Sequence, residues 1–185
     1  SGDGGRAKNA RLSYPSDVVV APNGEIYISS TDAHVIGKVD LSGTITTVAG
    51  FPNSPSFSGD RGPATSANLN SPNGLAFTCN GELLIADKEN HAVRVLHANG
   101  TITSFAGVGM IPGDSGDGGP AHLARLRNPF DVAVGPNCDV YIADTANQLL
   151  RKVDVNGIIT TVSGLARIAQ YTGDGGRADE ARLNY

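Results

Sequence analysis

The sequence predicts an all-β repeat protein, because one 57-residue pattern is written three times without an insertion or deletion and then begins again. A Gly-Asp-x-Gly element marks each start, at Gly2, Gly59, Gly116 and Gly173. Each copy holds four short β-type runs, and the turns between them leave no room for crossover helices. The predicted repeats are residues 1–57, 58–114 and 115–171, followed by a partial fourth repeat at 172–185, all in one domain of residues 1–185.

The four runs of the first repeat are expected to form an antiparallel meander. Residues 17–21 are nearly all apolar, as in a strand covered on both faces, and Pro22-Asn23-Gly24 predicts a tight turn into the second run. Ser42-Gly43 supplies the turn before a fourth run rich in β-branched residues. The expected strands are residues 17–21, 25–29, 35–40 and 44–49, with residues 131–134, 140–143, 149–154 and 158–163 in the third repeat.

About twenty residues separate the fourth strand of one repeat from the first strand of the next, which is long for a connection. Its second half carries small and apolar residues at helical spacing after a proline, as at Pro63, Ala64 and Ala67, so a short helix is expected there. Its first half varies between the copies and is the expected exposed tip. Four-stranded antiparallel units in tandem stack as the blades of a β-propeller, and this is the predicted fold, with three blades and short helices in the interblade loops.

Composition narrows the function classes. The chain is 39% hydrophobic and 17% charged, which is typical of a globular protein. A net charge of −4 argues against a nucleic-acid surface, and no run of 18 apolar residues is present, so no membrane insertion is expected. The sequence begins at Ser1 with neither an initiator Met nor a signal peptide, so any targeting segment is expected to lie outside it.

Three separated motifs in the third repeat resemble the NHL repeat. They are Tyr141-Ile142-Ala143-Asp144-Thr145-Ala146-Asn147, Leu150-Arg151-Lys152-Val153-Asp154 and Gly157-Ile158-Ile159-Thr160-Thr161-Val162. With the Gly-Asp-Gly-Gly-x-Ala element, the pattern is similar to the long form found in teneurin-like extracellular proteins. This resemblance implies an extracellular or secreted protein and a ring of six blades, of which three repeats would be half.

A half ring would leave an apolar blade face bare at each end, which soluble monomers rarely tolerate. The missing blades are expected either in the same chain, if it is longer, or in a second copy that associates head to tail. Residues 172–185 correspond one for one to residues 1–14, so the two segments would compete for one place in a head-to-tail pair. The longer chain is therefore the favoured expectation.

An acid and an arginine lie seven positions apart in two repeats, as Asp87 with Arg94 and Asp144 with Arg151. In the first repeat both are absent together, which indicates structural ion pairs across the hairpin. The alternative is that Arg94 and Arg151 face a ligand groove.

Two further features concern covalent chemistry. Cys79 and Cys138 fall in equivalent turns of neighbouring blades, so they are expected either to form a disulfide or to remain two inert thiols. Asn99-Gly100-Thr101 is a glycosylation sequon, although Asn-Gly is also the turn that a tight hairpin requires. Asn99 is thus a candidate glycan site in a secreted protein.

No metal, cofactor or catalytic signature rises above the repeat background. The aspartates of the glycine-rich element, at positions 3, 60, 117 and 174, are expected to satisfy backbone N–H groups rather than to bind calcium, because each stands alone. His34 and His91 occupy equivalent turns and are expected to bond locally or to meet solvent. The chain is therefore predicted to be non-enzymatic, with a metal-dependent lyase that uses the axial channel as the alternative.

The predicted function is a recognition or scaffold module that binds protein or glycan partners through its interblade loops or a propeller face. The candidate contact residues are Phe51, Phe57, Met110, Ile111 and Tyr171, which are equally expected to cover the core of a neighbouring blade. The alternatives are an architectural repeat of an extracellular assembly or filament and an RNA-binding NHL domain, which the acidic charge disfavours.

Overall fold

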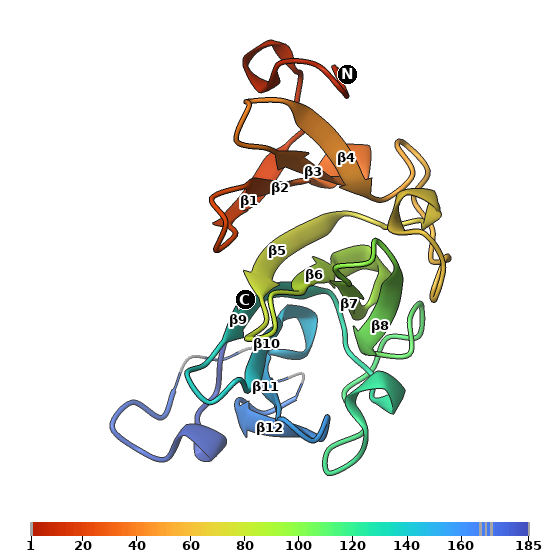
Figure 1. The fold of residues 1–185 in the computed structure, drawn as a ribbon. Coiled ribbons are helices and arrows are strands. Elements are labelled where there is room, and N and C mark those ends of the chain that lie inside the picture. Colours follow the sequence, from red (N-terminus) through yellow and green to blue (C-terminus); the bar gives the residue numbers. More distant parts are fainter. Residues whose placement is uncertain (1, 167, 169, 171, 185) are drawn as a thin grey trace.

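A computed structural model describes residues 2–166, 168, 170 and 172–184. It contains three separate four-stranded antiparallel sheets, each in simple sequence order, which we call blades 1, 2 and 3 (Figure 1). Blade 1 comprises β1 (Pro15–Val20), β2 (Ile26–Ser30), β3 (Val35–Val39) and β4 (Ile45–Ala49). Blade 2 comprises β5 (Pro72–Phe77), β6 (Leu83–Asp87), β7 (Ala92–Leu96) and β8 (Ile102–Ala106). Blade 3 comprises β9 (Pro129–Val134), β10 (Val140–Asp144), β11 (Leu149–Val153) and β12 (Ile159–Ser163).

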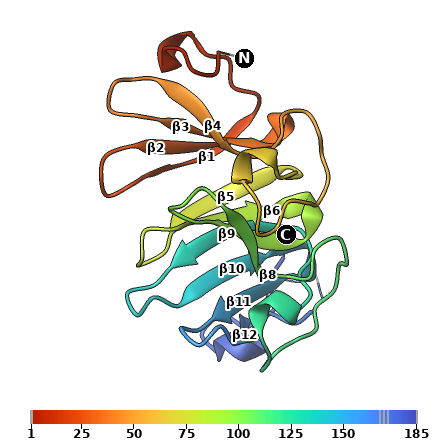
Figure 2. The ribbon, with the colours of Figure 1, turned by 45° about the vertical axis from the view of Figure 1, so that its right-hand side comes forward.

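The blades are stacked face to face in sequence order (Figure 2). The first strand of each blade meets the first strand of the next, since β5 contacts both β1 and β9. The all-β propeller fold is therefore confirmed. The first strands begin two residues earlier than expected in blades 1 and 3, because the pairing shifts between Pro15 and Asp17 and lets a proline open the strand.

The expected interblade helices are reduced to single 3₁₀ turns. They are η1 (Ala7–Asn9), η3 (Ala64–Ser66), η5 (Ala121–Leu123) and η7 (Ala178–Glu180). The helical pattern overestimated their length because the chain becomes extended again at once, with ψ of 152° at Ala67, to run along the next blade. Three further 3₁₀ turns, which the sequence did not predict, close the hairpin between the second and third strands: η2 (Thr31–Ala33), η4 (Lys88–Asn90) and η6 (Thr145–Asn147).

Each linker fastens two blades through its backbone. Ala64 accepts a hydrogen bond from Gly50 N–H at the end of blade 1 and donates one to Gly100 C=O in blade 2, both at 2.9 Å. The same arrangement recurs around Ala121. Gly50 must be glycine because its φ is +91° and a Cβ there would lie 2.2 Å from His34 C=O.

Two apolar cores lie between the blades, one at each joint. We call the side of a blade that faces the preceding blade its front face and the opposite side its back face. At one position of the front face the exposed fraction is 3% for Leu75 and 5% for Val132, but 58% for Val18 of blade 1. Val20 and Ile26 of blade 1 are likewise uncovered. A front face is therefore buried only where a preceding blade covers it.

A histidine joins each blade to the next. His34 and His91 follow η2 and η4 in the left-handed conformation, with φ of 58° and 56°. The Nδ1 atom of His34 accepts a hydrogen bond from Ser71 N–H at 3.0 Å, and that of His91 accepts one from Asn128 N–H at 3.2 Å. The sequence led us to expect that these histidines bond locally or meet solvent. The structure shows instead that each one accepts a hydrogen bond from the following blade.

This geometry predicts a pH-sensitive joint. Partial burial lowers the pKa of His34, and the charge of Asp32 partly opposes this. Partial burial also lowers the pKa of His91; the charge of Glu89 opposes this shift and that of Arg127 adds to it. A lowered folded-state pKa means that the neutral ring stabilises the fold above pH ~6.5 and that this contribution is lost as the pH falls through the folded-state pKa.

We therefore expect the change in unfolding free energy from pH 7.5 to pH 5, measured in urea, to be more negative for the wild type than for the double variant H34Q/H91Q. Glutamine fits this position, because Gln148 already occupies the equivalent left-handed position in blade 3. All carboxylates are shared by the two proteins, so an equal dependence in both would exclude the histidines as its cause.

Candidate functional site

The most unusual side chain of blade 2 is a fully buried arginine. Arg94, on β7, is 0% exposed, and its Nη1 lies 3.4 Å from Oδ2 of Asp87, which is also 0% exposed at the end of β6. Its Nη2 lies 2.5 Å from Oδ1 of Asp60 and 3.2 Å from Ser58 C=O, both on the preceding linker. The guanidinium therefore ties the β6–β7 hairpin to the linker that passes over it.

Blade 3 repeats this arrangement. Arg151 Nη1 lies 3.5 Å from Asp144 Oδ2, and Nη2 lies 2.6 Å from Asp117 Oδ1. In blade 1 the arginine position is Gly37, and Asp3 accepts a hydrogen bond from Thr47 N–H at 2.5 Å. The aspartate of the glycine-rich element thus serves as a bond acceptor over its own blade. In the part of the chain that the structure describes, no three His, Cys, Asp or Glu side chains are grouped as a metal site would require.

Burial sets the charge balance of these networks. Loss of contact with water raises the pKa of Asp87 and of Asp144 to about 6. Hydrogen bonds to Asp87 from Asn70 N–H at 2.7 Å and from Asn90 Nδ2 at 2.8 Å oppose the rise, together with the Arg94 charge. The bonding capacity of the arginines is incomplete, since Nε of Arg94 and Nε of Arg151 are buried without a partner.

Phe57 covers the arginine of blade 2. Its ring centre lies 4.8 Å from Cζ of Arg94, and a Cβ on Gly109 would lie 2.4 Å from the same ring. Of the two roles expected for Phe57, an exposed contact or a cover within the fold, the structure therefore has the second. The alternative that Arg94 and Arg151 face a ligand groove is also wrong, because both are 0% exposed.

Three other candidate contact residues are exposed on the linkers. Phe51 is 55% exposed, Met110 is 64% exposed and Ile111 is 49% exposed. The backbone beneath Met110 is fixed, because its N–H donates to Asn90 C=O at 2.7 Å. Tyr171, the remaining candidate, lies outside the described residues. The linkers thus present apolar side chains from an anchored backbone.

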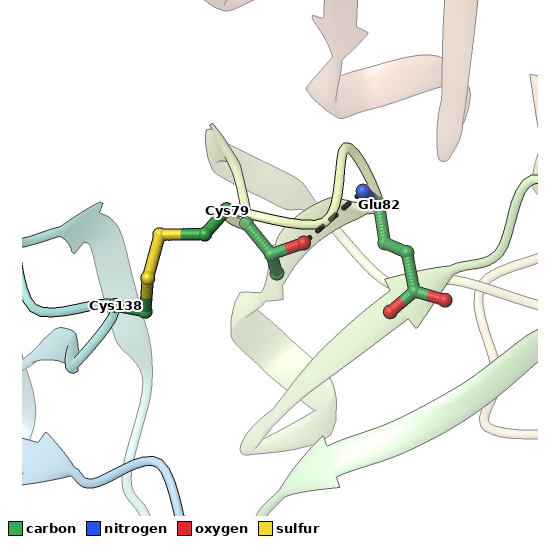
Figure 3. Close-up of a disulfide and its surroundings, with 4 residues drawn as sticks. Cys79, Glu82 and Cys138 are labelled. Carbon is green, nitrogen blue, oxygen red and sulfur yellow. Dashed lines mark hydrogen bonds between the residues drawn. A yellow bond between two sulfur atoms is a disulfide. The ribbon is translucent and has the colours of Figure 1, made fainter.

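A disulfide fastens blades 2 and 3 at their β5–β6 and β9–β10 turns (Figure 3). The sulfur atoms of Cys79 and Cys138 are 2.14 Å apart and their Cα atoms 5.7 Å apart. A hydrogen bond of 3.1 Å from Glu82 N–H to Thr78 Oγ1 closes the turn that carries Cys79. Of the two interpretations of these cysteines, the structure therefore has the bonded pair.

The candidate glycan site lies in the β7–β8 turn. Asn99 is exposed, and its Oδ1 accepts hydrogen bonds from Thr101 N–H at 3.0 Å and from Thr101 Oγ1 at 2.7 Å. Its side chain is therefore held in an Asx turn at the surface.

This chain is a segment of a repeat propeller. Its blades are stacked, linkers join consecutive blades, and in blades 2 and 3 an aspartate of the linker holds a buried arginine. The sequence model of the teneurin NHL domain family matches residues 1–56 and 96–173, and that of the NHL repeat matches residues 69–96. The chain therefore belongs to the teneurin NHL domain family, and the resemblance seen in its motifs is confirmed.

Several known proteins are similar in sequence. Teneurin-4 of Homo sapiens is 38% identical over 105 residues, which are 50% of this chain and 4% of that protein. Protein SUPPRESSOR OF QUENCHING 1, chloroplastic, of Arabidopsis thaliana is 35% identical over 162 residues, 83% of this chain and 15% of that protein. The chain thus spans only a small part of these relatives.

Solved structures share the fold. A protein of unknown function from Bacteroides thetaiotaomicron has a TM-score of 0.72 at 19% identity, with 94% of this chain and 41% of that chain covered. An auxiliary nutrient binding protein from Bacteroides ovatus has a TM-score of 0.66 at 25% identity, with 83% of this chain and 38% of that chain covered.

The Arg94 network gives a stability prediction. We expect R94M to lower the free energy of unfolding by about 3–5 kcal/mol, because it leaves the Asp87 carboxylate buried without its cation. Adding D87N should recover part of this loss, since the amide carries no charge. Urea unfolding of R94M and of D87N/R94M checks this, and a double variant less stable than R94M would contradict it.

Proposed function

We propose that this chain is a non-enzymatic recognition segment, in which the blades hold the interblade linkers in place and the exposed linker tips contact a protein or glycan partner. The observation that carries this proposal is the exposure of Phe51, Met110 and Ile111 on linkers whose backbone is bonded to the blades. Large apolar side chains presented by a fixed backbone favour binding, because little conformational entropy is lost on contact.

The described residues favour binding over catalysis. The carboxyl groups whose pKa is raised most strongly, on Asp87 and Asp144, are 0% exposed and have arginine partners, so a substrate does not reach them. A catalytically inactive virginiamycin B lyase from Staphylococcus aureus shares the fold with a TM-score of 0.56 at 14% identity, which carries no activity to this chain. The net charge of −4 disfavours the RNA-binding alternative.

An extracellular setting is part of the proposal. Similarity to teneurins supports it, and so does the Cys79–Cys138 disulfide, since such bonds persist in oxidising compartments. Asn99 would carry a glycan there. Across residues 2–166, 168, 170 and 172–184, no helix is long and apolar enough to cross a membrane.

The bare front face of blade 1 favours a second role as an assembly unit. Val18, Val20 and Ile26 are exposed. The residues equivalent to Ile26 in blades 2 and 3, Leu83 and Val140, are only 2% and 4% exposed. We propose that the back face of another blade covers this surface, supplied either by further repeats in a longer chain or by a second copy.

A loop-tip experiment tests the recognition proposal. We expect the triple variant F51S/M110S/I111S to bind its partner at least about tenfold more weakly than the wild type, a loss of ~1.4 kcal/mol. Binding is measured on a glycan array and on cell surfaces, with L41S as the control, because Leu41 is an equally exposed apolar residue outside the linkers. Equal binding by the triple variant and the wild type would contradict the proposal.

The front face is tested separately by light scattering after size exclusion. We expect the wild-type chain to self-associate or to bind an apolar dye, and the variant V18D/V20D to do less of both. A wild-type chain that stays monomeric and binds no dye contradicts the idea that this face requires a cover.

A further inference from the structure

A cavity of about 390 Å³, open to solvent on one side, lies between blades 1 and 2. Tyr27 and Val48 line it from the back face of blade 1, Phe77 and His97 from the front side of blade 2, and Thr65 from the linker. Its volume lies within the range of small-ligand pockets, roughly 300–1,000 Å³.

The next joint carries other side chains at the same positions. Blade 2 places Phe105 where blade 1 has Val48, and Leu84, which is 0% exposed, where blade 1 has Tyr27. Blade 3 places Val134 where blade 2 has Phe77, and both Phe105 and Val134 pack against the core between blades 2 and 3. The pair of aromatic rings that lines this cavity is therefore particular to the first joint.

The walls combine apolar surface with fixed polar groups. The rings of Tyr27 and Phe77 meet edge to face with their centres 5.3 Å apart. His97 is held by Glu82 at 2.7 Å and by Thr103 at 2.9 Å. Burial raises the pKa of the Tyr27 phenol, so its hydroxyl remains a neutral donor and acceptor.

Lys38 also lines the cavity, but its charge is already matched. Its Nζ lies 2.8 Å from Oε1 of Glu25, the residue just before β2. The same combination recurs on the back face of blade 3, where Tyr141 accompanies Lys152, whose Nζ is 3.6 Å from Asp139. Blade 2 has valine at the lysine position. The tyrosine and the lysine ion pair thus occur in the same blades. Because Lys38 is paired with Glu25, it has no unmatched charge to attract an anion.

We propose that this cavity binds one neutral pyranose sugar. A pyranose is the matching shape, because it has an apolar face for one of the two perpendicular rings, Tyr27 or Phe77, and a rim of hydroxyl groups for Tyr27, Thr65 and the paired Lys38. Since the charges of the wall are paired, a neutral ligand fits better than an anion. The cavity does not include the linker tips Phe51, Met110 and Ile111, and V48F changes the cavity alone, so separate variants distinguish the failure of this proposal from the failure of the recognition proposal.

The test is saturation-transfer NMR on the 185-residue chain with neutral methyl glycosides of glucose, galactose, mannose and N-acetylglucosamine. We expect at least one glycoside to bind in the millimolar range, on the order of −4 kcal/mol. V48F should weaken this binding at least about tenfold, because it fills the cavity with the ring that Phe105 supplies at the next joint.

V162F is the matched control. It adds the same ring at the equivalent position of blade 3, away from the cavity, and should leave glycoside binding unchanged. If V48F fails to fold by circular dichroism, Y27F replaces it, since it removes only the hydroxyl group and should also weaken binding. Two outcomes would overturn the proposal: no binding of any glycoside by the wild type, or full binding by the folded V48F or Y27F variant.

Discussion

The burial of each blade by its neighbour is the interaction on which the rest of this structure depends. A four-stranded blade has two apolar faces and no means of covering either one itself. Leu75 and Val132 are almost completely buried, whereas the equivalent Val18 is exposed, and only the presence of a preceding blade differs. Linker bonds, the histidine joints and the disulfide all act on this same contact.

The two joints solve the same packing problem with different fastenings. At the first, the Asp17 carboxylate accepts a hydrogen bond from Leu75 N–H at 2.7 Å. At the second, Asp131 lies so close to Gly74 that a Cβ there would be 2.2 Å from its Oδ1, and a disulfide closes the outer turns. Equivalent positions thus hold different side chains at the two joints, so each joint is fastened in its own way.

The sequence predicts what the repeat period controls. The strands and the blade count follow from comparing positions 57 residues apart, and the same comparison places Cys79 and Cys138, which are 59 residues apart, in equivalent turns. The sequence does not predict contacts between a linker and a strand, because no general rule fixes how many residues separate the two partners. The link from Asp60 to Arg94 spans 34 residues between linker and strand. The packing of Phe57 onto Arg94 leaves no periodic trace, so the sequence could not decide between an exposed and a covering role for Phe57. One signal of that network was available in the sequence: the first repeat lacks both the acid and the arginine, with Ser30 and Gly37 at their positions.

The disulfide has a mechanical consequence for a chain that is pulled from its two ends. It joins residues 59 positions apart, so a force along the backbone passes through the sulfur bridge and bypasses everything between Cys79 and Cys138. At about 3.4 Å per extended residue, this withholds roughly 200 Å of extension. Most of blade 2 lies inside the bypassed stretch and carries no tension, so blade 1 and the later part of blade 3 would yield first.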